Sequence, residues 1–127
     1  MEHRFDKHYT RDEARALLPQ IRKWLEHLNR LRKDLERFDK RIGGLAEQGS
    51  DTGGKTVNEW IRTQADMQEI LAEFQRRRIM IKNVERGLID FPAIIGGKEV
   101  FLCWEQDEEG IEFWHDIEAG YGGRERL

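Results

Sequence analysis

Cysteine is almost missing from this sequence, which contains one, and proline is nearly as rare, with two. A single cysteine cannot form a disulfide within the chain, and this composition is typical of a reducing compartment. No apolar run approaches the roughly 20 residues of a membrane-spanning helix. The amino-terminal MEHRFDKHYT also lacks the apolar stretch of a secretion signal. We therefore expect a cytoplasmic protein that does not partner with a membrane.

An excess of positive charge is also missing. The 22 basic and 25 acidic residues give a net charge of −3, so no overall basic field attracts nucleic acid, and we expect none as a partner. Charged residues make up 37% of the chain and hydrophobic residues 38%, which favours long solvated helices. A chain of 127 residues is expected to form a single domain with a modest core.

Residues 10–43 carry the pattern of a long amphipathic helix. Thr10 and Glu13 have the spacing of a capping box, in which each side chain satisfies an amide of the first turn. Gly43-Gly44 predicts the end of the helix. Apolar residues recur at alternating spacings of four and three, which is typical of a coiled-coil seam. The seam consists of Leu17, Ile21, Trp24, Leu28, Leu31, Leu35, Phe38 and Ile42.

A second helix is predicted over residues 56–77, after a polar loop at 44–55. Thr56 and Glu59 have the spacing of another capping box. The helix could continue as far as residue 86, or a short strand could follow it at residues 79–82. Its predicted seam consists of Val57, Trp60 or Ile61, Gln64, Met67, Leu71 and Phe74.

Residues 88–116 have the pattern of a three-stranded antiparallel meander, followed by a glycine-rich tail at 117–127. Gly96-Gly97 predicts a two-residue turn, because the favoured hairpin turn requires positive φ at both positions. That turn pairs Ile95 with Lys98, Ala93 with Val100, Phe91 with Leu102 and Ile89 with Trp104. For the longer second connection we pair Trp104 with Ile111, Leu102 with Phe113 and Val100 with His115.

Side chains alternate across a sheet, so this register defines a core face and an outer face. The core face carries Ile89, Phe91, Ala93, Val100, Leu102, Trp104, Ile111, Phe113 and His115. The outer face carries Leu88, Asp90, Pro92, Phe101, Cys103, Glu105, Glu112, Trp114 and Asp116. The predicted fold is α+β: a long antiparallel helical hairpin packed on a small antiparallel β-meander. The core face should cover the first part of the helix predicted at residues 10–43.

Four residues are candidates for a ligand or metal site. Asp90, Cys103 and Glu112 share the outer face, where two carboxylates beside a thiol could bind a divalent metal or support a nucleophilic cysteine. The two carboxylates are separated by roughly 10 Å across three strands, however, and no paired metal-ligand motif is present. His115 could be a base or ligand, but this register places it on the core face, away from Cys103. A buried histidine bonded by its neighbours is the simpler interpretation.

An apolar patch is also predicted on the outer face. Pro92, Phe101 and Trp114 would lie together there, and soluble monomers rarely leave such a surface bare. The helical hairpin would expose further apolar flanks at Ile61 and Ile70. The 117–127 tail, a second copy of the chain or a different partner could cover the patch, but the tail is short and can shield it only in part. A two-fold dimer is the commonest closed arrangement for such surfaces, so we expect a homodimer.

Several strings of the sequence carry a family resemblance. They are Tyr9-Thr10 with Glu13-Ala14, Leu17-Leu18-Pro19, Glu85 to Ala93, Val100 to Trp104, Trp114-His115-Asp116 and Gly120 to Leu127. Through them the chain resembles a bacterial family catalogued as domain of unknown function 2203. Asp107-Glu108 stands where the family has Gly-Glu, so that turn could differ. The family has no assigned activity, and the resemblance therefore implies fold boundaries and no mechanism.

Two functions remain open at this point. The favoured hypothesis is a non-enzymatic interaction or assembly module without a cofactor, which uses the hairpin and the outer sheet face to bind a second copy or another protein. The alternative is a small-molecule or divalent-metal-binding protein, which could be an enzyme. Its site would comprise Asp90, Cys103, Glu112 and His115.

Overall fold

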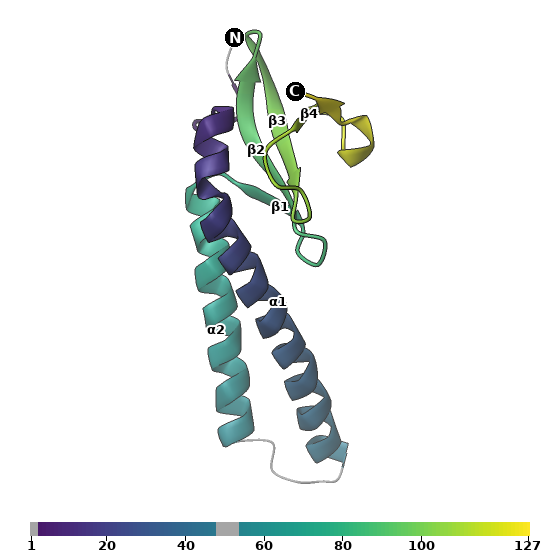
Figure 1. Cartoon of the computed structure of the whole chain (residues 1–127). Coiled ribbons are helices and arrows are strands. Elements are labelled where there is room, and N and C mark those ends of the chain that lie inside the picture. Colours follow the sequence, from purple (N-terminus) through teal and green to yellow (C-terminus); the bar gives the residue numbers. More distant parts are fainter. Residues whose placement is uncertain (1–2, 48–53) are drawn as a thin grey trace.

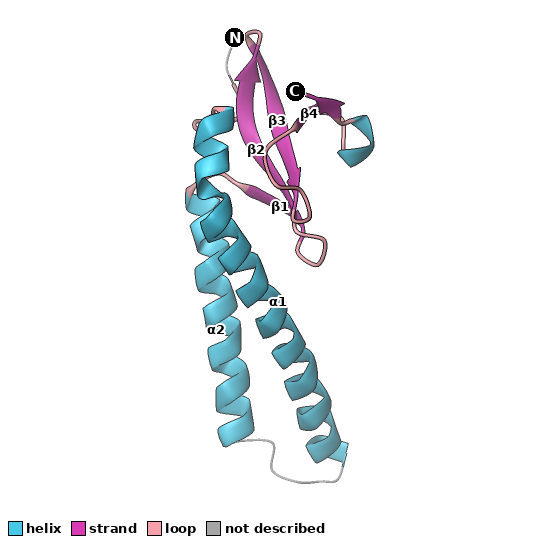
Figure 2. Cartoon of the chain, viewed as in Figure 1, coloured by secondary structure: helices cyan, strands magenta, loops and turns pink. Residues whose placement is uncertain are grey.

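The protein is described by a computed structural model that covers residues 3–47 and 54–127. Two antiparallel helices lie side by side, and an antiparallel sheet of five strands packs at one end of the pair (Figures 1 and 2). The fold is therefore α+β, a long helical hairpin on a small antiparallel sheet, as the sequence predicts. The described helices include none with the length and apolar character needed to cross a membrane.

Helix α1 spans Arg11–Glu47. The capping box at its start is confirmed: the amide of Glu13 donates to Thr10 Oγ1 and the amide of Thr10 donates to Glu13 Oε1, each at 3.1 Å. The predicted end at Gly43-Gly44 is wrong. Neither glycine has a positive φ, so both continue the helix, and a glycine inside a helix costs only about 1 kcal/mol relative to alanine.

Helix α2 spans Lys55–Arg76, and its predicted capping box is wrong. The N-cap is Gly54, with φ of 82°, and no side chain caps the first turn. Thr56 is already inside the helix, where its hydroxyl cannot take the cap position. Of the predicted loop at 44–55, residues 48–53 lie outside the described part of the chain.

The contrast between the two helix starts gives a stability prediction. Thr10→Ala should lower the free energy of unfolding by about 1 kcal/mol, because it removes a side-chain acceptor from a first-turn amide. Thr56→Ala should change it by less than about 0.5 kcal/mol, because Thr56 caps nothing. Urea denaturation of both variants measures the difference. Equal losses would contradict the assignment of the α2 start.

After α2 the sequence allows either a helix that continues to residue 86 or a short strand, and the structure decides between them. The helix stops at Arg76, Arg78 takes a left-handed φ of 59°, and strand β1 follows at Met80–Asn83. The short strand is thus confirmed, and a helix running to residue 86 is wrong. The α2 seam also differs, because Ile70 is 7% exposed and packs in the core, whereas Gln64 is exposed. Ile70 is therefore not an open flank.

The sheet has the order β1-β2-β3-β4-β5. Its remaining strands are β2 Leu88–Ile95, β3 Lys98–Glu105, β4 Phe113–Asp116 and β5 Glu125–Arg126. All four predicted pairs of the β2–β3 hairpin are confirmed. Gly96 and Gly97 occupy the turn with φ of 57° and 80°, as the two-residue turn requires.

The predicted register between β3 and β4 is wrong by one residue. The pairs are Val100 with Asp116, Phe101 with His115, Leu102 with Trp114 and Cys103 with Phe113. Ile111 is 1% exposed and reaches the core from the connection that precedes β4, so its burial does not require a partner on β3. A shift of one residue moves every β4 side chain to the opposite face.

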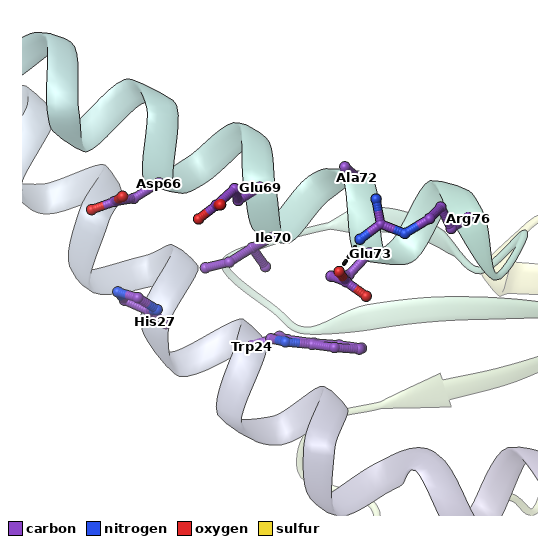
Figure 3. A pocket seen from close by; sticks show the side chains of 8 residues that line it. All are labelled: Trp24, His27, Asp66, Glu69, Ile70, Ala72, Glu73 and Arg76. Atoms are coloured by element: carbon purple, nitrogen blue, oxygen red, sulfur yellow. Dashed lines mark hydrogen bonds and ion pairs between the residues drawn. The ribbon is translucent and has the colours of Figure 1, made fainter.

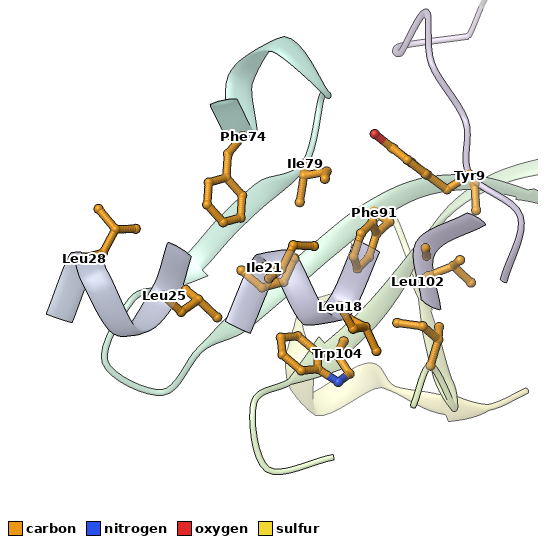
Figure 4. Packing of buried hydrophobic residues seen from close by; sticks show 14 of the residues in the cluster. Tyr9, Leu18, Ile21, Leu25, Leu28, Phe74, Ile79, Phe91, Leu102 and Trp104 are labelled. Carbon is orange, nitrogen blue, oxygen red and sulfur yellow. The ribbon is translucent and has the colours of Figure 1, made fainter. Parts of the chain in front are cut away.

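The core lies where the prediction places it. The first half of α1 packs on the face of the sheet that carries Phe91, Leu102 and Trp104, and Leu18, Ile21 and Leu25 point into this layer (Figure 4). Tyr9 extends the core before α1 begins, with its hydroxyl donating to the Arg77 carbonyl at 2.6 Å.

The residues predicted as a tail are built into the sheet. A 3₁₀ turn, η1, spans Tyr121–Gly123, and β5 pairs with β4. The amide of Leu127 donates to the Glu112 carbonyl at 2.8 Å. Between β4 and β5 the chain passes over the outer face of the sheet, because Ile117 and Tyr121 line a cavity there together with residues of β2 and β3.

Candidate functional site

Asp90, Cys103 and His115 come together on the outer face of the sheet, from the neighbouring strands β2, β3 and β4. Their possible ligand atoms all lie within 4.8 Å of one another. The three residues are 1%, 1% and 3% exposed. The predicted separation of Cys103 from His115 is thus wrong, because the corrected register brings the histidine to the face of the thiol.

Glu112, the fourth predicted site residue, is not part of this cluster. It lies before β4, and its carboxylate is 3.7 Å from Arg126 Nη1 on the exposed edge. The corrected register explains the difference, because Phe113 and not Glu112 lies opposite Cys103.

His115 is held at both ring nitrogens. Its Nδ1 lies 2.8 Å from the carbonyl oxygen of Asp116, which can only accept, so Nδ1 carries a proton and donates. Its Nε2 lies 3.1 Å from both carboxylate oxygens of Asp90. A hydrogen bond between Nε2 and the carboxylate needs one proton, which either group can carry, and a cation bound to both groups could take the place of that proton.

The thiol of Cys103 is kept protonated by its surroundings. Burial raises its pKa, and the nearby charge of Asp90 adds to the effect, so that the pKa reaches about 12. A nucleophilic cysteine has a lowered pKa and an electropositive setting. The raised pKa of Cys103 is therefore the opposite of the lowered pKa of a catalytic cysteine. Its thiolate forms only when a strong positive partner is present.

This leads to a reactivity prediction. At pH 8 a pKa of about 12 leaves roughly one thiolate in ten thousand, so metal-free Cys103 should resist iodoacetamide in the folded protein. The same thiol should react readily in urea. Mass spectrometry of the alkylated chain gives both rates, and rapid modification of the folded protein would contradict the buried placement.

A cavity of 190 Å³ lies above the cluster. Asp90, Cys103 and His115 form the floor of the cavity. The chain that follows β4 covers it, and Lys82 lies at its side. The remaining lining residues are Leu88, Phe101, Ile117, Ala119, Gly120 and Tyr121.

Arg124 fastens the cover of the cavity. Its Nη2 donates to both carboxylate oxygens of Glu108, at 2.8 and 2.6 Å. Its guanidinium also lies 3.9 Å from the ring centroid of Phe113 and 4.6 Å from that of Tyr121. The carboxyl-terminal segment is therefore held over the site by an ion pair and by two aromatic contacts.

The predicted apolar interface patch of Pro92, Phe101 and Trp114 is wrong. Phe101 is 4% exposed, because Phe5 packs edge-on against it at a centroid distance of 5.4 Å. Pro92 is also fully buried. Trp114 faces the other way, opposite Leu102, and packs against the core. The amino-terminal segment and the carboxyl-terminal cover thus occupy the face, whereas the prediction allowed the tail only a part of it and gave the rest to a second copy.

Two further polar groupings occur in the described residues. His3, His8 and Glu99 form a surface cluster, in which the Glu99 carboxylate already accepts the amides of Arg4 and Phe5. It serves to hold the amino-terminal segment against the sheet.

A second hollow, of 550 Å³, lies between the helices. Figure 3 shows Trp24 and His27 of α1 on one side and acidic residues of α2 on the other, with Glu73 paired to Arg76. Its polar groups are not among the ligand clusters found in residues 3–47 and 54–127.

Fold and site together define a small α+β protein with a buried Asp–Cys–His cluster under a carboxyl-terminal cover. The chain belongs to the family described as uncharacterized conserved protein (DUF2203), which matches residues 7–127 and so includes the whole cluster. No curated protein and no solved structure matches the chain.

Proposed function

We propose that this protein binds a divalent transition metal, with zinc as the best fit, through Asp90 Oδ, Cys103 Sγ and His115 Nε2. The observation that carries the proposal is the hydrogen bond from His115 Nδ1 to the Asp116 carbonyl at 2.8 Å. A metal-binding histidine is oriented by such a bond from its second nitrogen, which leaves the first one aimed at the metal. Here that first nitrogen faces the Asp90 carboxylate.

The ligand types favour zinc over other common cations. A thiolate, an imidazole and a carboxylate are a set that zinc accepts, whereas calcium and magnesium prefer oxygen ligands alone. Bonds of about 2.0–2.3 Å at tetrahedral angles place ligand atoms roughly 3.5 Å apart. The ligand atoms of the cluster lie within 4.8 Å of one another, so small side-chain movements are sufficient.

A metal ion also fits the polar atoms of the site. A zinc ion would bind Asp90 and His115 in place of the proton between them and would stabilise the Cys103 thiolate. Because the thiol pKa is about 12 without metal, binding at neutral pH displaces a proton, and zinc affinity should fall as the pH is lowered. A reducing cytoplasm, in which we place the protein, would keep the thiol available.

The fourth coordination position would face the cavity. Structural zinc sites use four protein ligands, whereas sites with three keep a position for water or a ligand. The described residues offer three ligands at this point. The arrangement therefore supports a site that binds an exogenous ligand at the fourth coordination position. In an enzyme, the substrate or a water molecule would bind at that position.

Elemental analysis tests the proposal. The purified protein, incubated with zinc and then desalted, should retain about one zinc per chain. Asp90→Asn and His115→Gln should retain much less. Glu112→Gln should bind as the wild type does, and so should His3→Gln combined with His8→Gln, which removes the surface cluster. Equal retention by all variants would place the metal elsewhere, and no retention by the wild type would overturn the proposal.

Self-association through the helical hairpin is a second proposal. Ile61 on α2 is 53% exposed, and a homodimer would cover it. Light scattering should then give a mass above the 15.1 kDa of one chain, and Ile61→Ser should weaken the dimer. A monomeric mass for the wild type at tens of micromolar would rule it out.

A further inference from the structure

We infer that the cavity above the cluster binds a small monocarboxylate, whose carboxylate group lies between the metal and the ammonium group of Lys82. This inference rests on the proposed function, because the carboxylate would fill the open coordination position. It adds the class of ligand and the residue that selects its charge.

Lys82 is directed to the cavity by an irregularity of β1. The register between β1 and β2 shifts between Ile81 and Asn83, so that Lys82 is the extra residue of a bulge. Bulges re-aim side chains and are frequent next to binding sites. The Lys82 Nζ atom lies 5.7 Å from the ring centroid of Phe101, another lining residue.

The charge of Lys82 has no carboxylate partner in the described part of the chain. The lysines that form ion pairs there are Lys7, Lys55 and Lys98. Lys82 is an exposed residue, and it lines a cavity with otherwise apolar walls and a polar floor. An ammonium group in this position is available for an anion that enters the cavity.

The charge of the site favours a ligand with one negative charge. Lys82 is the only lysine or arginine among the residues that line the cavity. A single anionic group is therefore enough to pair with it.

Size and shape select a small molecule. The volume of 190 Å³ corresponds to about six water molecules at roughly 30 Å³ each. A carboxylate suits two separated cationic partners, because its two oxygens can be shared between them. The apolar walls formed by Leu88, Ile117 and Ala119 suit a short hydrocarbon remainder.

Acetate is the probe, and acetamide is its neutral counterpart of the same shape. Both are titrated into zinc-loaded and metal-free protein, with zinc measured in each sample and backbone amide spectra recorded by NMR. Acetate should shift the amides of residues 117–121 with half-saturation below about 10 mM, within the range open to a ligand of a few heavy atoms. Acetamide should produce no saturable shift.

The variants identify the partner of the anion. Lys82→Gln should weaken acetate binding roughly tenfold or more, the effect of losing one charge-assisted hydrogen bond, and Lys82→Arg should largely preserve it. Lys55→Gln, a distant exposed lysine, should behave as the wild type.

The outcomes separate the two proposals. Samples without zinc overturn the metal site and with it the metal-bound position of the carboxylate, and the metal-free titration then decides whether the anion binds beside Lys82. Zinc retention without a saturable acetate shift in either sample overturns the inference and leaves the metal site intact. Equal binding of acetate and acetamide, or of wild type and Lys82→Gln, also overturns the inference.

Discussion

Replacing Cys103 by serine should lower the zinc affinity of this protein at least about 100-fold, beyond the 10- to 100-fold that changes around the ligands cost. The serine hydroxyl keeps the size of the side chain but removes the sulfur ligand. Competition with a chromophoric chelator measures the two affinities.

The matched control for this prediction is Glu112→Gln, which removes a carboxylate that shares the predicted outer face but lies outside the cluster. It should change the affinity by less than about threefold, since surface ion pairs contribute little. Comparable losses in Cys103→Ser and Glu112→Gln would contradict the assignment of the ligands. An unchanged affinity in Cys103→Ser would exclude the thiolate.

Phe91→Ala should destabilise the protein by roughly 3–5 kcal/mol, the range for truncating a fully buried aromatic side chain. Phe91 is completely buried between the sheet and α1. The midpoint of urea denaturation should fall with little change in its slope.

Phe113→Ala is the matched deletion. Phe113 is half-buried and carries the guanidinium groups of Arg124 and Arg126 on its ring, so the variant should cost less than about half as much. The register predicted from sequence places both phenylalanines in the core and so requires similar losses. Similar losses would therefore contradict the observed β3–β4 pairing.

The β2–β3 hairpin could be predicted from sequence because its turn allows only one register. Gly96-Gly97 fixes the number of loop residues, and each pair along β2 and β3 follows from it. The helical hairpin was also predictable, because its apolar residues recur over many turns. The helix ends were less so, since Gly43-Gly44 can stop a helix or continue it.

The second hairpin could not be registered because its connection is long and makes its own bonds. The amide of Glu105 donates to Glu108 Oε1 at 2.7 Å, and Trp104 Nε1 donates to the Glu108 carbonyl at 3.0 Å. These hydrogen bonds hold the loop together without a two-residue turn that would fix the register. The prediction relied on the alternation of apolar residues alone and so paired Ile111 with Trp104.

The candidate site depended on that register. Asp90 and Cys103 were predictable as neighbours, because the first hairpin pairs them. His115 was recognised as a candidate but assigned to the wrong face. The positions of Lys82 and Tyr121 in the cavity could not be predicted from the sequence, because a bulge and a short 3₁₀ turn leave no periodic pattern in it. The sequence Trp114-His115-Asp116 held one clue, since a histidine beside an acidic residue is less suited to an apolar core than a tryptophan.

Cobalt(II) substitution tests the central claim most directly, because the spectrum reports both the geometry and the ligands of the metal. One equivalent of cobalt added to the metal-free protein should give the intense visible bands of a four-coordinate ion, together with a thiolate-to-cobalt charge-transfer band in the near ultraviolet. The charge-transfer band should disappear in Cys103→Ser. The weak visible bands of six-coordinate aqueous cobalt, without charge transfer, would contradict a metal site at Asp90, Cys103 and His115.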